Sequence, residues 1–167
     1  LDASHPVAEQ LLDLLIHADQ AAFVALLSGR VVAHLKAGRF DQAHALSRRL
    51  EAGGGLDDEG RYLALVSGLA AQPGRKELGR ASRTTDPVLR QIVALLGKGN
   101  AVARRLPRDK LVGADDLFYV GFNFVESKDE EEREFGGSLL GHLADTQPRS
   151  KRGRSAKNKL RLVGLAE

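Results

Sequence analysis

Residues 117–148 read LFYVGFNFVESKDEEEREFGGSLLGHLADTQP and show most clearly how the chain folds. Apolar residues recur there every three or four positions and never alternate with period two, which is the pattern of amphipathic helices. One face of the first expected helix carries Leu117, Val120, Gly121 and Phe124. The neighbouring face carries Phe118, Phe122 and Val125. The stretch therefore predicts two helices joined by an acidic link.

The same spacing continues through almost the whole chain, so we expect an all-α protein. Turn signals such as Gly53-Gly54-Gly55 and Pro73-Gly74 separate the helices. The expected helices cover 4–15, 23–35, 40–50, 57–69, a short segment around 78–81, 87–96, 101–106 closed by Pro107, 115–125, 130–144 and 150–163. Because the links are short, we expect successive helices to pack antiparallel as hairpins.

Residues 117–148 resemble the tetratricopeptide repeat, a family of helical hairpins with a known pattern of large and small residues. Leu117 stands for the Trp, Val120-Gly121 for Leu-Gly and Phe124 for the Tyr; Gly136, Leu140, Leu143 and Pro148 follow on the second helix. Gly121 and Gly136 would let the two backbones approach closely. The link from Glu126 to Glu132 is longer than the family's turn, so a looser hairpin is expected there.

A second segment, from Gly38 to Ala43, resembles the turn between helices in the same family, with Ala43 as the small contact residue. The helix before it departs from the pattern, because Arg30 and His34 replace Leu and an aromatic residue. The resemblance implies an α-solenoid of stacked antiparallel hairpins. We expect one domain over 1–167, made of hairpins in 1–52, divergent hairpins in 57–106, the best repeat in 114–148, and a basic capping helix and tail in 149–167.

Charge is distributed unevenly along the 167 residues, which carry 25 basic and 22 acidic side chains. Residues 149–161 contain seven basic residues and no acidic one, so the preceding 148 residues hold 18 basic against 21 acidic. The seven are Arg149, Lys151, Arg152, Arg154, Lys157, Lys159 and Arg161. The interpretation favoured here is the solvated face of a capping helix; the alternative is binding of nucleic acid or an anionic surface.

The sequence contains no cysteine and no methionine. The first absence limits the possible chemistry, and the second bears on whether the chain is part of a longer protein. Without Cys, disulfides, thiol nucleophiles and Cys-ligated zinc are excluded. A chain that starts at Leu1 and has no Met is expected to be a piece of a longer protein. The Arg-, Ala- and Leu-rich composition suggests a bacterial source. No apolar run reaches the length of a membrane span, so we expect a cytoplasmic protein, with the periplasm left open.

The sequence offers few candidates for chemistry. The five His residues are scattered without metal-ligand spacing, and no Gly-x-Ser-x-Gly or phosphate-loop motif occurs. We therefore expect no catalytic residue, no metal and no cofactor. An enzyme would be favoured if two or more of Asp115, Asp116, His142 and Asp145 converged in a deep pocket.

The predicted function is that of a non-catalytic scaffold or adaptor, within a larger regulatory, signalling or assembly protein. In the tetratricopeptide family, the first helix of each hairpin lines a concave groove that binds peptides or helices. The corresponding residues are Asp115, Phe118, Phe122 and Val125. Aromatic anchors of this kind dominate many interfaces, and their apolar character argues against clamping of a carboxylate. The alternative left open is that Phe118 and Phe122 pack beneath the final helix or the preceding hairpin.

Overall fold

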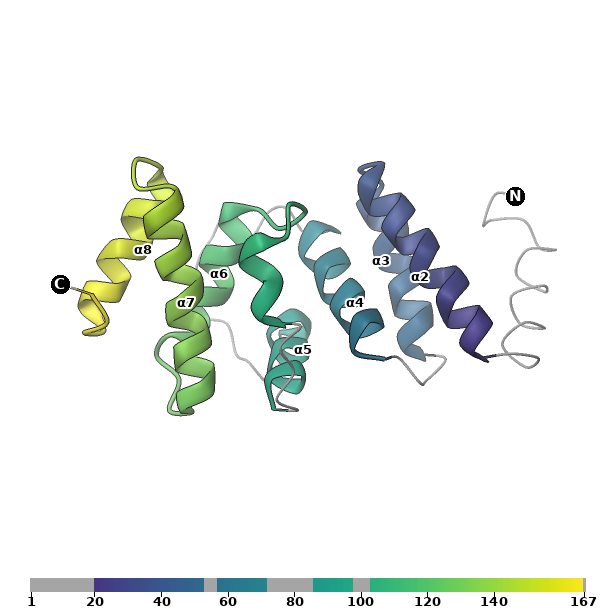
Figure 1. Cartoon of the computed structure of the whole chain (residues 1–167), viewed down its shortest axis with the longest axis horizontal. Coiled ribbons are helices and arrows are strands. Elements are labelled where there is room, and N and C mark those ends of the chain that lie inside the picture. The colour runs from purple at the N-terminus through teal and green to yellow at the C-terminus, as the bar shows by residue number, and fades with distance from the viewer. Residues whose placement is uncertain (1–19, 53–56, 72–85, 98–102, 167) are drawn as a thin grey trace. The chain divides into compact units, whose positions relative to one another are not determined.

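The computed structural model describes residues 20–52, 57–71, 86–97 and 103–166 (Figure 1). These residues form seven α-helices and one 3-10 helix, and contain no strand. The elements are α2 (Gln20–Lys36), α3 (Phe40–Ala52), α4 (Asp58–Ala71), α5 (Pro87–Leu96), the 3-10 helix η1 (Ala103–Arg108), α6 (Ala114–Phe124), α7 (Glu130–Thr146) and α8 (Lys151–Leu162). The all-α prediction is confirmed. The helices expected at 4–15 and 78–81 and both quoted turn signals lie outside the described residues.

The chain divides into two compact units, Leu1–Ser67 and Gly68–Glu167, with the boundary inside α4. Residues 62–69 of α4 are all buried, which is the environment expected for a helix that is apolar all round. Within the first unit, a buried hydrogen bond of 2.7 Å joins the hydroxyls of Ser47 on α3 and Ser67 on α4. This pair satisfies two polar groups that would otherwise be costly to bury.

The α2–α3 hairpin of the first unit forms where the sequence predicted it. Gly38 adopts a φ of 70°, a conformation that side chains disfavour. The N–H of Arg39 donates to the carbonyl of His34 at 2.9 Å, and that of Gly38 donates to Leu35 at 3.1 Å. These two bonds are a Schellman motif, which ends α2 sharply and lets α3 turn back against it. Ala43 is fully buried, as expected for a small contact residue.

In the second unit, helices α6, α7 and α8 pack side by side (Figure 1). Side-chain caps begin two of them: Asp129 accepts the N–H of Glu132 before α7, and Ser150 accepts that of Gly153 before α8. The rings of Phe124 and Phe135 meet edge to face at 5.9 Å in the α6–α7 contact.

The α6–α7 hairpin is tight, so the expectation of a looser hairpin was wrong. A Cβ on Gly136 would lie 2.7 Å from the carbonyl carbon of Phe124, so the backbones do touch at this glycine. The longer link is held by Ser127, whose hydroxyl donates to the Glu132 carboxylate and accepts the N–H of Asp129. The extra residues therefore fold into a hydrogen-bonded turn and do not separate the helices.

A second correction concerns the segment before α6. The sequence predicted a helix over 101–106 that Pro107 would close, but η1 is a 3-10 helix of Ala103–Arg108 that contains Pro107. The fixed φ of proline lies within the 3-10 range, so Pro107 fits this two-turn helix at the cost of a single N–H. Leu106 is fully buried within it.

Replacing Gly121 with leucine should destabilise the second unit by about 2–4 kcal/mol through overpacking. A Cβ at this position would already lie 2.9 Å from Leu140 Cγ and 3.1 Å from the Gly136 carbonyl oxygen. Thermal unfolding followed by circular dichroism measures the effect. A melting temperature equal to that of the wild type would show that the α6–α7 contact is not as close as described.

Candidate protein-interaction surface

The four residues expected to line a partner groove lie on or just after α6, and α8 lies over them. Phe118 and Val125 are buried, with 5% and 1% of their surfaces exposed. Phe122 is half-buried, and its ring stacks on that of Phe118 at a centroid distance of 5.9 Å. Asp115 is exposed. These residues therefore do not form a surface open to solvent; the structure has the arrangement of the alternative interpretation, in which the aromatic residues pack beneath the final helix.

Two basic residues of α8 lie against this aromatic pair. The guanidinium carbon of Arg152 is 5.2 Å from the centre of the Phe118 ring, and its Nε donates to the Asp115 carboxylate. The ammonium of Lys159 is 4.4 Å from the centre of the Phe122 ring and 2.7 Å from Glu126 Oε1. Each cation thus contacts one aromatic ring and one carboxylate. Both contacts are electrostatically favourable for a positive charge.

The two cations lie on the same side of α8. Arg152 and Lys159 are seven residues apart, or about two turns of α8. Their side chains are 16% and 11% exposed, much less than is usual for surface cations. Partial burial strengthens both the ion pairs and the cation–ring contacts relative to exposed ones. We name these two contacts the α6–α8 clasps.

Removing one clasp cation should cost more stability than removing an exposed cation of the same helix. Lys159→Ala is expected to lower the free energy of unfolding by about 1–2 kcal/mol, because it removes the ring contact, the ion pair and a packed aliphatic stem. Lys151→Ala, at an exposed position of α8, should change it by less than about 0.5 kcal/mol. Urea unfolding of both variants makes the comparison. Equal losses would mean that the clasp adds nothing.

The other five residues of the predicted basic surface are exposed to solvent, unlike Arg152 and Lys159. Lys151, Arg154, Lys157 and Arg161 are exposed on α8, and Arg149 is exposed in the turn before it. A guanidinium nitrogen of Arg154 donates to the Arg149 carbonyl at 2.6 Å. The predicted solvated basic face therefore contains five of the seven residues, because the clasps use the remaining two.

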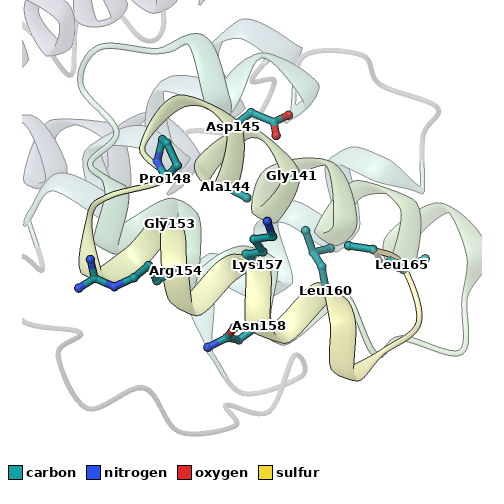
Figure 2. Close-up of a pocket in the computed structure, with 11 residues that line it drawn as sticks. Gly141, Ala144, Asp145, Pro148, Gly153, Arg154, Lys157, Asn158, Leu160 and Leu165 are labelled. Carbon is teal, nitrogen blue, oxygen red and sulfur yellow. The ribbon is translucent and has the colours of Figure 1, made fainter.

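An open groove of about 490 Å³ runs between α7 and α8 (Figure 2), and we name it the terminal groove. Its lining comes from α7, the following turn, α8 and the chain end: Gly141, Ala144, Asp145, Pro148, Gly153, Arg154, Lys157, Asn158, Leu160, Leu165 and Ala166. Figure 2 shows Lys157 extending from α8 toward Ala144 on α7. The lining of the groove is mainly apolar and includes three charged side chains, those of Asp145, Arg154 and Lys157.

Small residues create the terminal groove. Gly141 has no heavy atom within 4 Å of the position where a Cβ would stand, so α7 offers bare backbone there. Gly153 allows the start of α8 to pack tightly against the end of α7. Neither glycine was predicted from the sequence to have this role. The spacing of Gly137, Gly141 and Ala144 on one side of α7 is the signal that could have found it.

A helix cap positions the far end of the groove. After α8, Gly164 adopts a φ of 73°, and the N–H of Leu165 donates to the Leu160 carbonyl at 2.9 Å. This second Schellman motif folds Leu165 back over Gly137 of α7. Leu165 remains 49% exposed and Leu162 is 83% exposed, so apolar surface is open to solvent beside the groove.

The residues weighed for catalysis are dispersed. Of the four, Asp145 lines the terminal groove, Asp115 pairs with Arg152, and Asp116 accepts the N–H of Gly113 at 3.3 Å. The fourth, His142, is absent from the groove lining. Within residues 20–52, 57–71, 86–97 and 103–166, no three His, Asp or Glu side chains are grouped as metal ligands would be.

The chain matches no protein-family model, and no curated protein and no solved structure is significantly similar to it. Among the described helices, none combines the length and the apolar character that crossing a bilayer requires. The likeness to the tetratricopeptide repeat thus rests on the residues of the two hairpins alone.

Proposed function

We propose that the chain is a protein-binding module built from helical hairpins and that it binds through the terminal groove. The observation that carries the proposal is a groove open to solvent, with a mainly apolar lining and charged side chains from two helices. Protein interfaces combine an apolar centre with a polar rim in this way. The mechanism is recognition without covalent chemistry. As a piece of a larger regulatory or assembly protein, the module would hold that protein to its partner.

The tetratricopeptide resemblance supports this function through the packing it predicted. Gly121, Gly136 and Ala43 occupy close contacts between paired helices, as the family pattern implies. The terminal groove lies between two packed helices, α7 and α8. Binding through Phe118 and Phe122 would instead require α8 to leave them.

The alternative, binding of nucleic acid through α8, has weaker support. Phosphate contacts need extended cationic side chains directed to solvent. Arg152 and Lys159 are directed to the aromatic rings and carboxylates of the α6 segment. Asp145 also places a negative charge on the edge of the groove opposite Lys157, where a phosphate would be repelled.

Site-specific photo-cross-linking in cells that make the protein tests the proposal. A photoreactive residue at Asn158, which lines the groove, should give a protein adduct of discrete mass that resists nuclease. The same residue at Lys128, exposed in the α6–α7 link, is the control and should not give that adduct.

Blocking the groove should remove the adduct. Gly141→Trp fills the groove, whereas Gly29→Trp places the same side chain at another open helical glycine, on α2. We expect loss of the adduct only with the first. A nuclease-sensitive adduct would favour the nucleic-acid alternative. Identical results at Asn158 and Lys128 would contradict binding at the groove.

A further inference from the structure

The last two helices carry opposite charges. Helix α7 contains four Glu and one Asp against one Arg, a net charge of −4, whereas α8 contains six basic residues and no acidic one. Ion pairs and hydrogen bonds within the protein use some of these charges, but α7 stays acidic and α8 stays basic. Glu131 pairs with Arg104, and Glu132 accepts the Ser127 hydroxyl, while the clasps occupy Arg152 and Lys159.

The charges that remain are exposed on both helices. On α7, Glu130, Glu134 and Asp145 are exposed and form no ion pair with any described residue. On α8 the same holds for Arg154 and Lys157. Helical spacing places Glu130, Glu134 and Asp145 on the same side of α7 as the small residues Gly137 and Gly141. In the lining of the terminal groove, the α7 edge carries one acidic residue, Asp145, and the α8 edge carries two basic residues, Arg154 and Lys157.

This arrangement selects among possible occupants. An acidic helix or a phosphate backbone would be attracted to α8 and repelled by α7. A basic partner would be attracted to α7 and repelled by α8. A second copy of the same hairpin, related by a two-fold axis, places α7 against α8 twice and satisfies both edges. Two-fold interfaces are self-complementary in this sense, and they are the commonest in homo-oligomers.

We propose that the terminal groove is a self-association surface, in which the α7–α8 hairpins of two copies dock across a two-fold axis. Asp145 of each copy then faces Lys157 and Arg154 of the other. Gly141 and Ala144 allow the close approach of helices, and the exposed Leu162 and Leu165 lie on the same hairpin. This inference rests on the proposed function, because it names the partner of the same groove.

Sedimentation equilibrium of the full chain in low salt tests the inference. The wild type should form a dimer that weakens as salt is added, because exposed charge pairs are screened. Asp145→Lys and Lys157→Glu should each weaken the dimer at least tenfold, since each places like charges opposite one another. Lys151→Glu makes the same charge change outside the groove lining and should leave the dimer unchanged.

Mixing the two groove variants gives the decisive result. In a heterodimer of Asp145→Lys with Lys157→Glu, one contact is a swapped ion pair and the other is the native pair. The mixture should therefore form a dimer although each variant alone is monomeric. A monomeric wild type, or a dimer that all three substitutions leave intact, would overturn the inference.

The two proposals can fail separately. A monomeric wild type that still gives the Asn158 cross-link to another protein would keep the binding function and remove self-association. A monomer without that cross-link would contradict both. A cross-linked adduct with twice the mass of the protein would agree with both.

Discussion

Replacing Gly153 with alanine is expected to detach α8 from α7 or to destabilise the second unit by about 3 kcal/mol or more. A Cβ there would stand 2.7 Å from the Gln147 carbonyl carbon and still closer to its oxygen. The Leu143 carbonyl oxygen, at 3.1 Å, blocks movement in another direction. The obstacles are backbone atoms, which cannot rotate away as a side-chain tip can.

Two measurements separate the possible responses to Gly153→Ala. A lower melting temperature reports loss of global stability, whereas faster proteolysis within 149–166 reports release of α8 alone. Asn158→Ala, at an exposed position of the same helix, is the control and should change neither. A variant with wild-type melting and wild-type proteolysis would show that α8 does not pack at Gly153 as described.

Gly136→Ala should have an effect of similar size, about 3 kcal/mol or more, at the α6–α7 contact. The new Cβ would lie 2.7 Å from the Phe124 carbonyl carbon and 2.9 Å from its Cβ, with the Val125 amide nitrogen closer still. Helix α7 would have to move away from α6, and the contact between the Phe124 and Phe135 rings would loosen.

The same helix supplies a matched control for this prediction. Gly141 lies five residues further along α7 and has open space where its Cβ would stand. Gly141→Ala should leave stability unchanged or raise it by about 0.5–1 kcal/mol, because alanine favours the helix. Chemical unfolding of both variants gives the comparison. Equal effects of the two substitutions would contradict the close packing at Gly136.

Local signals explain why much of the fold could be predicted. The stripe Phe23, Leu27, Val31 and Leu35 has helical spacing, and all four residues are buried on α2. Gly38 and Ser150 mark helix ends through backbone conformation and side-chain capping, and both act within a few residues. Gly121 and Gly136 were identified because a repeat pattern connects small residues to close helix contacts.

The candidate site was harder to predict because its contacts are distant in sequence. Phe118 and Phe122 were correctly placed on one helical face, but the spacing of a single helix does not show what covers that face. Arg152 lies 37 residues from Asp115, and Lys159 lies 33 residues from Glu126. The sequence does not distinguish the basic residues of α8 from one another. In the structure, two of them contact the aromatic pair and the others are exposed to solvent.

The sequence alone determined the helical character of the chain, the ends of several helices and the small residues at the α6–α7 contact. These features depend on helical periodicity and on hydrogen bonds between near neighbours. Only the tertiary structure decided that α8 covers the aromatic pair and that a groove opens between α7 and α8. Both depend on which helix faces packed against each other, and the contacts over the aromatic pair join side chains that the chain order separates by more than thirty residues.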